Sequence, residues 1–463
     1  MPRLHWALAG AVVLAAALPA LASEGGTAEP GMLTLTSTVD TGDSNPTEQW
    51  FDHAKHPTSW LTWGADERMR WEYLDNGITL NEKAPGHVLN FQRYRSRVWS
   101  TVAPCKEFEV GARLAWEGRH WCAPAAKKDW DWAQAFFDNL YAKVRPMPNL
   151  TLTIGRQDII MGDGWLILEG TPLDGSTSIY FDAFRATYTA KEINTTVDAI
   201  FIQQWSSPDM WLPTMNDTDR AQIEQNERGA VLYVTNKSIQ NLEASGYFIY
   251  KNDEKVLANG DQGDIYTPGF RLAEQFTPNF GARVEVAGQW GERNGHPLCA
   301  WGMNSRATYA FKDTWNNQLF FNFEYLSGDK PGTNKNEAFD PLWGRWPQFS
   351  ELYVYSYAGE TRIAETTNLI RFGPGYTVCP TKEMELDFTY QPLFAVENSQ
   401  RGRVGFSDHG NFRGTLLTGV LKYKFNQHVA THLWAEYFMP GDYYSPAHGD
   451  DAIYLRAEVV LSF

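Results

Sequence analysis

Apolar and polar residues alternate along most of this chain. In the final segment, from Ile453 to Phe463, every second residue is apolar, and the intervening positions include Arg456 and Glu458. Because successive side chains of a strand point to opposite faces, this pattern predicts a β-strand with one apolar and one largely polar face. In a soluble sandwich the apolar face covers a core, whereas in an outer-membrane barrel it faces lipid and the polar face lines a wet lumen. This strand alone fits both architectures.

Alternating segments of about ten residues recur from Leu61 to the end of the chain. Short and long connections between these segments alternate along the chain. Short ones include VRPMPNLTL and TAKEINTT, and long ones, rich in Gly, Asp, Asn and Pro, include DNGITLNEKAPGH and the stretches 206–224 and 327–361. This alternation of short and long connections is typical of a barrel with one periplasmic and one extracellular rim. We therefore predict an all-β fold: a single transmembrane, antiparallel, up-and-down β-barrel of about eighteen strands over residues 61–463.

The polar faces of several predicted strands carry charge. In FQRYRSRVW, Arg93, Arg95 and Arg97 share one face. An arginine facing lipid costs about 2–4 kcal/mol at the bilayer midplane, so such faces are predicted to point inward. A lumen without water would bury many charges at high cost, which predicts a charged, water-containing channel. The candidate residues of one lumen patch, two or three strands wide, are Arg68, Arg70, Arg93, Arg95 and Arg97, with Arg113 and Arg119 on or just beyond the next strand.

Inward arginines and acids can also pair simply to brace the barrel wall, and this alternative stays open. The ladder of Arg93, Arg95 and Arg97 favours a second role. Like charges two residues apart repel unless acids oppose them or an anionic ligand passes, and guanidinium suits bidentate contact with carboxylates. Glu436, on the strand THLWAEYF beside His432, is a further lumen candidate. The histidine is expected to pack or hydrogen-bond there rather than to catalyse.

The first residues of the chain have a different pattern. Arg3, an apolar run over 6–18 and the sequence Ala20-Leu21-Ala22 predict a secretory signal peptide over residues 1–22. The apolar run is too short to span a membrane as a helix. Residues 23–60 are rich in Gly, Thr, Ser and Pro and lack periodicity, so we predict a flexible periplasmic segment.

Composition agrees with an exported barrel. Aromatic residues make up 14% of the chain, with 19 Trp and 21 Tyr, which suits interfacial girdles, although carbohydrate-binding surfaces use the same residues. The net charge of −15 argues against nucleic acid as a partner. Four cysteines are too few and too scattered for a disulfide framework and lack zinc spacing. A bond between Cys122 and Cys299 stays open.

Catalytic signals are missing from the sequence. It contains no GxSxG elbow, HExxH or phosphate loop. Acids that face each other in a barrel are more often ion pairs than a glycosidase couple, which needs a defined separation. No ligand spacing for calcium stands out in the Asp/Asn-rich loops. We expect no enzymatic activity, no cofactor and no metal.

An ordered set of motifs resembles a known family. GRQDIIMGDGWLILEG is followed by YFDAFRATY, and EYLSGDKPGTNKNEAFDPLWGRW and AEYFMPGDYYS come later. With RMRWEY and RYRSRV near the start, the set is similar to the alginate-export family of outer-membrane barrels over about 61–463. The resemblance implies a monomeric barrel whose arginine-rich constriction passes polyanionic uronate polymers. By motif match, the lumen candidates are Arg68, Arg70, Arg93, Arg95, Arg97, Arg156 and Arg185, with Asp163 and Asp182 as acidic candidates. The resemblance also predicts that the stretch 158–180 folds into the barrel mouth and narrows it.

Two functions from different classes remain. The first is an outer-membrane channel for anionic oligo- or polysaccharides such as alginate, or for smaller anions by a general porin-like route. Its expected partners are outer-membrane lipid, the barrel insertion machinery and periplasmic export proteins. The second is a secreted, soluble, β-rich protein, an enzyme or a lectin, that stacks sugars on its tryptophans. The acidic strand EMELDFTY departs from a simple arginine-lined lumen.

The terminal residue gives a first testable prediction. A closing strand that ends in an aromatic residue resembles the signal read by the insertion machinery, and its pairing with the first strand removes the sheet edge. Deleting Phe463 is expected to lower the amount of inserted barrel without removing the secreted chain, as measured by heat-modifiable gel migration. A normal yield of heat-modifiable protein from the deletion variant would contradict this interpretation.

Overall fold

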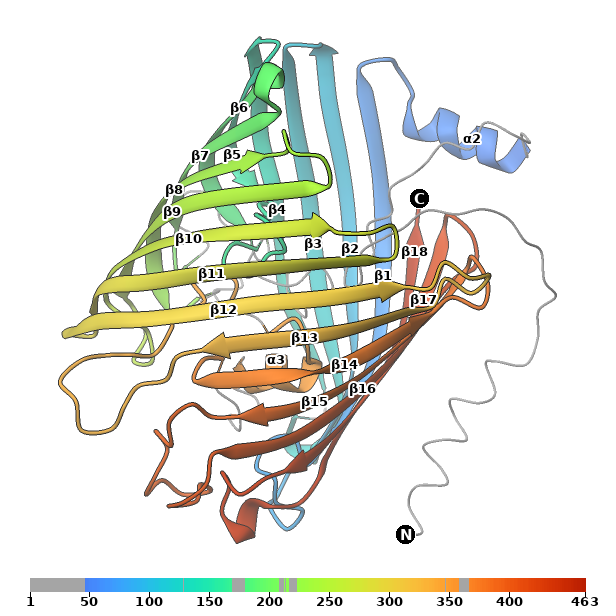
Figure 1. Ribbon diagram of the computed structural model, residues 1–463. Helices are drawn as coiled ribbons and strands as arrows, with labels where there is room; N and C mark the ends of the chain where they lie inside the picture. Colours follow the sequence, from blue (N-terminus) through green and yellow to red (C-terminus); the bar gives the residue numbers. More distant parts are fainter. Residues whose placement is uncertain are drawn as a thin grey trace.

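A computed structural model describes the chain over residues 46–127, 129–168, 180–207, 212, 214–215, 223–345, 347–357 and 366–463. Within these residues an 18-stranded antiparallel sheet closes on itself (Figure 1). Each strand pairs with the next in sequence, and β1 pairs with β18. The predicted fold class and strand number are therefore confirmed. The predicted signal peptide, residues 1–22, lies outside the described residues.

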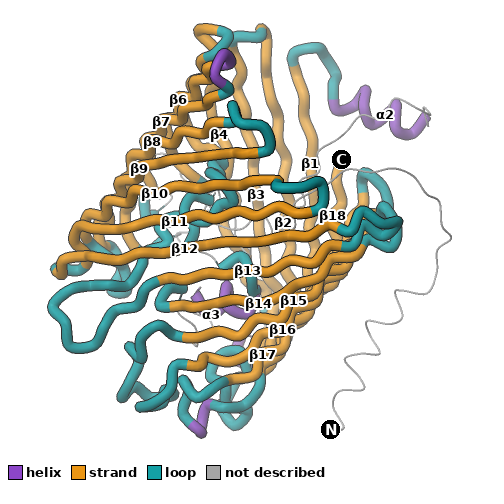
Figure 2. Tube along the Cα trace, viewed as in Figure 1, coloured by secondary structure: helices purple, strands orange, loops and turns teal. Residues whose placement is uncertain are grey.

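The strands run almost the full height of the barrel, and helices are few and short (Figure 2). The strands are β1 (Leu61–Asp75), β2 (Val88–Cys105), β3 (Phe108–Ala123), β4 (Trp130–Met147), β5 (Leu150–Gln157), β6 (Phe181–Ala190), β7 (Thr195–Gln204), β8 (Gln225–Asn236), β9 (Leu242–Lys255), β10 (Gly263–Gln275), β11 (Phe280–Arg293), β12 (His296–Ala310), β13 (Gln318–Leu326), β14 (Leu369–Val378), β15 (Met384–Phe394), β16 (Phe412–Lys424), β17 (Val429–Pro440) and β18 (Ala452–Ser462). In the described part of the chain, the α-helices are α2 (Pro46–Lys55) and α3 (Glu351–Tyr357). Among the described residues, no helix is long and apolar enough to cross a membrane.

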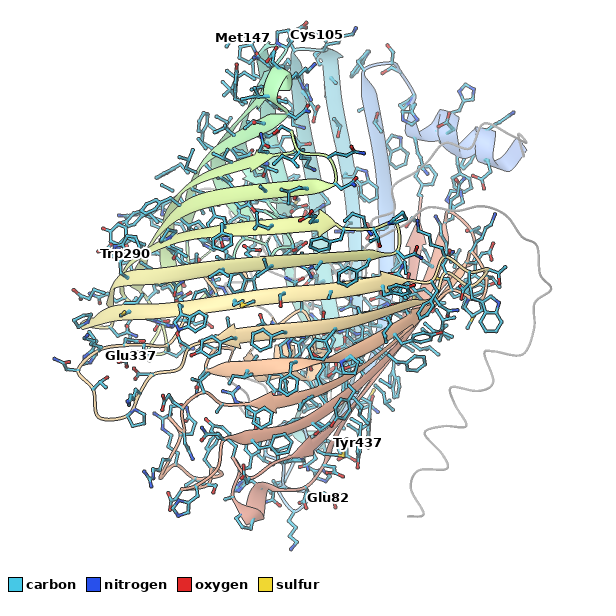
Figure 3. All side chains as sticks on the ribbon, viewed as in Figure 1. Glu82, Cys105, Met147, Trp290, Glu337 and Tyr437 are labelled. Carbon is cyan, nitrogen blue, oxygen red and sulfur yellow. The ribbon has the colours of Figure 1, made fainter. Side chains whose placement is uncertain are left out.

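Short turns gather at one rim and longer loops at the other. Cys105 and Met147 mark the short-turn rim, and Glu82 and Glu337 mark the long-loop rim (Figure 3). One connection on the long-loop rim differs from the sequence-based expectation. The β11–β12 connection is a tight turn through Asn294 and Gly295, with φ of 54° and 79°. An Asn-Gly pair adopts this left-handed backbone readily, so it forms a two-residue hairpin where a long loop was predicted.

The strands turn apolar side chains outward and charged ones inward. On β1, Met69 and Trp71 are exposed, whereas Arg68, Arg70 and Glu72 are buried inside the barrel. This arrangement follows from the high cost of placing charge against lipid.

Exposed aromatic side chains gather towards both rims, as expected for aromatic girdles. At the long-loop side, Trp116 and Trp130 each stack on Trp132, with ring centroids 4.9 and 4.8 Å apart. At the short-turn side, exposed rings include Phe276 and Phe311. The apolar outer band therefore ends in exposed aromatic side chains on both sides.

The interior of the barrel is partly filled by folded-in loops. Residues 158–168, 339–345 and 347–357, which we call the plug, come from the β5–β6 and β13–β14 connections. The backbone amides of Trp343 and Gly344 both donate to the carbonyl of Leu166 at 3.0 Å, which joins the two loops. Helix α3 lies within the barrel outline in Figure 1. The plug places a hydrophobic cluster inside the barrel, which the sequence analysis did not predict.

Glycines in the wall make room for the plug. A Cβ atom at Gly229 on β8 would overlap the ring of Trp343, because the outer edge of the indole occupies the space that a side chain at this position would take. At Gly302 on β12, a Cβ atom would approach the rings of Phe339 and Trp165 at 3.1 Å. These side-chain-free positions act as sockets for plug aromatics.

Of the segment over residues 23–60 that was predicted to be flexible, residues 23–45 lie outside the described residues. Residues 46–55 form helix α2, which is joined to the barrel where the Trp63 indole donates to the Ala54 carbonyl at 2.7 Å. The helix was missed because its apolar positions are few and its stability depends on the barrel surface. All four cysteines lie in the described part of the chain and are free, so Cys122 and Cys299 are not bonded.

Candidate functional site

The inner face of β1, β2 and β3 carries arginines in directly opposed positions. Arg70 on β1 lies opposite Arg93 on β2, which in turn lies opposite Arg119 on β3. In the neighbouring row, Arg68 lies opposite Arg95. Like charges directly opposite each other destabilise a sheet, so this arrangement needs compensating groups. The set that we call the arginine wall consists of Arg68, Arg70, Arg93, Arg95, Arg97 and Arg119.

Carboxylates border the arginine wall. The guanidinium of Arg97 donates twice to Asp66, from Nη2 at 2.7 Å and from Nε at 3.0 Å to the same oxygen. Arg70 donates from Nε to Glu458 of β18, and its Nη1 lies 3.8 Å from Glu72. For Arg70 and Arg97 the structure therefore has the wall-bracing ion pairs that the sequence analysis kept as an alternative.

Arg93 and Arg95 lie in the middle of the wall and are covered. Their exposed fractions are 6% and 8%. Glu117 lies directly opposite Arg95 on β3. These two side chains are therefore buried in the wall rather than open to solvent. Arg97, whose side chain is 22% exposed, is the member of the ladder that reaches solvent.

The other predicted arginines are braced by acids. Arg113, next to the wall on β3, donates from Nε to Asp138 at 2.7 Å and from Nη2 to Asp158 at 3.1 Å. Asp158 begins the plug, so this contact joins the plug to the wall.

Arg156 and Arg185 lie on β5 and β6, away from the arginine wall. Arg156 donates to Asp182 at 2.9 Å, and its guanidinium carbon lies 3.5 Å from the ring centroid of Tyr180. Arg185 donates to Asp198 at 2.8 Å. These two motif-matched arginines therefore form separate ion pairs outside the arginine wall.

Asp163 holds the β5–β6 loop across the lumen. Arg271 of β10 donates to its carboxylate from Nε at 2.9 Å and from Nη2 at 3.0 Å, and Arg283 of β11 donates to the same carboxylate. Nearby, the Trp165 indole donates to Glu324 of β13 at 3.0 Å. The described part of this loop thus lies inside the barrel, as predicted from the motif resemblance.

The pKa of Asp163 is lowered from its ordinary value of 3.8. Burial alone would raise this pKa, but the hydrogen bond from Arg271 and the positive charges of Arg283 and Arg271 more than offset burial. The carboxylate therefore stays ionised at every pH where the barrel is expected to work.

Glu436 of β17 binds the start of α3. It accepts the hydroxyl of Ser350 at 2.6 Å and the backbone amides of Glu351 and Leu352 at 2.8 and 3.1 Å. The first amides of a helix lack partners within the helix, so a wall carboxylate satisfies them here. Arg456 of β18 completes the contact by donating to the carboxylate of Glu351 at 2.6 Å. Glu436 is thus a plug anchor, not a free lumen carboxylate.

The arginine wall and the Asp163 contact face each other across the barrel. In the 18-stranded sheet, β11 lies half-way around from β2. The arginine wall and the strands that hold Asp163 therefore lie on opposite sides of the barrel. Among the described residues, no group of His, Cys, Asp and Glu side chains is placed to hold a metal ion.

Two functional arginines were missed by sequence reasoning. Arg271 lies on β10, where the Pro268-Gly269 pair interrupts the alternation that reveals inward positions. Arg345 lies in the plug and donates to Glu227 of β8 at 2.5 Å. Its loop gave no strand periodicity from which its direction could be inferred.

Comparison with known families agrees with the motif resemblance. The model of the alginate export family matches residues 60–458. Comparison with curated proteins gives no significant match.

Solved outer-membrane porins share the fold. OccAB2 of Acinetobacter baumannii is 9% identical, with a TM-score of 0.58 over 87% of this chain and 98% of that one. OccK7 (OpdD) of Pseudomonas aeruginosa is 12% identical, with a TM-score of 0.55 over 88% and 99%. OccK2 (OpdF) of Pseudomonas aeruginosa, solved in complex with glucuronate, is 11% identical, with a TM-score of 0.52 over 87% and 98%.

The Asp163 contact gives a prediction about pH. A group whose pKa is lowered by folding contributes stability above its unfolded pKa and loses it only as pH falls through the lower folded value. The contribution of Asp163 to the docking of residues 159–168 should therefore be equal at pH 7 and pH 5. Asp163→Asn should remove it at both, because hydrogen bonds to a charged group are worth about 1.5–3 kcal/mol, or roughly a ten- to hundredfold change in opening.

Hydrogen exchange of the loop amides, corrected for intrinsic rates, measures this docking. Asp198→Asn, which breaks the ion pair with Arg185 between strands β7 and β6, is the matched control and should leave the protection of the loop amides unchanged. If Asp163→Asn kept full protection at pH 7, the contact would not be what holds the loop.

Proposed function

Because the chain belongs to the alginate export family, as its match over residues 60–458 shows, we propose that it passes carboxylated oligo- or polysaccharides, uronate polymers such as alginate, along the arginine wall. The protein is an outer-membrane channel for anions or saccharides, not an enzyme. The observation that carries the finer proposal is the set of opposed arginines on β1, β2 and β3.

The spacing of the wall suits a polymer with repeated carboxylates. Alternate residues of a strand are about 7 Å apart, and neighbouring strands about 4.8 Å apart. The arginines therefore form a grid of cations rather than one binding point. A carboxylate moving past this grid exchanges one guanidinium fork for the next, and contacts that are weak and multiple allow the polymer to leave as well as enter.

The bordering acids set the strength of these contacts. Asp66 and Glu458 already bind Arg97 and Arg70, so a passing carboxylate competes with wall carboxylates for the same donors. This competition favours moderate anion preference over tight binding. Arg97, which is part-exposed, is the first contact for the polymer, and Arg93 and Arg95 become reachable when neighbouring side chains shift.

The acidic side chains of strand β15 are compatible with a channel for anions. Glu385 and Asp387 of β15 lie 2.7 and 3.2 Å from the ammonium group of Lys422 on β16. Their charge is therefore partly compensated locally. Glucuronate, the sugar acid present in the OccK2 complex, is the smallest probe of the proposed ligand class.

Replacing Arg93, Arg95 and Arg97 with Gln should move the reversal potential in planar bilayers toward cation selectivity and weaken block by uronate oligomers. The substitution removes three cations beside Asp66 and Glu117, which makes this side of the lumen more negative. Arg185→Gln, on a separate ion pair, is the control and should change selectivity less. Heat-modifiable migration verifies that the barrel is folded. Unchanged ion selectivity in the folded triple variant would mean that the arginine wall only stabilises the barrel and does not select anions.

Shortening the β5–β6 loop between Met161 and Ser176 should raise single-channel conductance, because this loop reaches across the lumen to Arg271 and Arg283. The matched control shortens the exposed β15–β16 loop within 400–405, which should leave conductance unchanged. Equal conductance of both variants and the parent would rule out a constriction at Asp163.

A further inference from the structure

Helix α2 lies on the lipid side of the barrel. On β1 the odd-numbered residues face outward, as the exposed Met69 and Trp71 demonstrate, and Trp63 belongs to this series. The Trp63 indole donates to the Ala54 carbonyl at 2.7 Å, which fixes the end of α2 against the outer wall. Figure 1 places α2 beside the C-terminus, outside the strands.

The terminal residue of the chain is the main contact of α2. The Phe463 ring lies 5.3 Å from the Phe51 ring, 4.8 Å from the Trp63 ring and 6.2 Å from the Trp50 ring. The Lys55 ammonium lies 5.9 Å from the centroid of the Phe463 ring. An aromatic cluster thus covers Phe463 from the outside.

The helix also spans the seam where the barrel closes. Glu48 lies 3.2 Å from Nε2 of His428, in the β16–β17 turn, and the Phe51 ring lies 4.1 Å from the His428 ring. Its contacts therefore reach the β17 end, β18 through Phe463 and β1 through Trp63. This docking surface is complete only when β18 has paired with β1.

The free side of α2 carries a large exposed ring. Trp50 is 61% exposed and Trp60, just after the helix, is 47% exposed. Both lie at the short-turn rim, where the exposed rings of Phe276 and Phe311 belong to the barrel's aromatic girdle. Tryptophan at such a level prefers the boundary between headgroups and acyl chains. The surface of α2 is therefore continuous with the lipid-facing wall.

We propose that α2 is an interfacial helix that seats Trp50 in the inner-leaflet phospholipid of the outer membrane and covers Phe463 after the barrel has closed. The occupant of the exposed face is phospholipid. The helix charges are of both signs, with Glu48 and Asp52 beside His53 and Lys55, so ring insertion rather than attraction to anionic headgroups drives the contact. The proposal does not depend on what the channel carries.

Spin labels test the lipid contact. In the full-length protein with all four cysteines changed to Ser, single cysteines replace Trp50 or Asp52, whose side chain is 80% exposed. In phosphatidylethanolamine–phosphatidylglycerol vesicles, the label at position 50 should collide several-fold more with oxygen than with a water-soluble nickel chelate, relative to the label at position 52. Equal, water-like accessibility at both positions would overturn the lipid contact. A label replacing Trp60 repeats the measurement without altering the helix.

Removal of helix α2 tests whether the helix docks after the barrel has closed. Deleting residues 46–55, or changing Phe51→Ala, should leave the yield of heat-modifiable barrel at the parent level and lower the temperature at which the barrel unfolds. Asp52→Ala is the control and should change neither. An unchanged unfolding temperature in the deletion variant would mean that α2 does not secure the seam. A fall in yield equal to that caused by deleting Phe463 would mean that α2 acts before closure, contrary to the proposal.

Discussion

The inner wall of this barrel carries many buried charges, and the plug supplies ion-pair partners for several of them. Asp163 binds Arg271 and Arg283, and Asp158 binds Arg113. In the reverse sense, Arg345 of the plug binds Glu227 of β8. Breaking one partner of a buried pair is costly because the other charge stays buried. Wall and plug are therefore one electrostatic unit, and the position of the loops follows from the charges on the strands.

The barrel itself was predictable because its signal is local. Outward apolar and inward polar residues alternate at every second position, and this rule needs no knowledge of distant contacts. The plug was not predictable in the same way. Segments such as WLIL (165–168) and ELYVY (351–355) are largely apolar, but their burial depends on strands far away in sequence. The β11–β12 turn through Asn294 and Gly295 could have been predicted, because Asn-Gly is a strong hairpin signal. A long loop was predicted there instead, because short and long connections alternate along the rest of the chain.

The sequence predicted which strands carry the inward-facing arginines of the candidate site. It did not predict the pairing register that decides which arginines lie opposite each other. The sequence put Arg70 and Arg93 on inward faces, but only strand pairing places them opposite each other and beside Arg119. Motif resemblance selected Arg156 and Arg185, and the structure gives each a carboxylate partner instead of a place in the wall. Glu436 was selected for the lumen and lies there, yet its partners belong to α3, whose position no strand pattern encodes.

The glycine sockets make the bore of the channel a property of the wall as much as of the loops. Trp343 occupies the space that any side chain at Gly229 would take, and Trp165 and Phe339 approach Gly302 in the same manner. The plug therefore sits where the strands lack side chains, and a methyl group at such a position would push an aromatic ring toward the pore axis. Related barrels with identical loop lengths can thus differ in pore shape through one small residue on a strand.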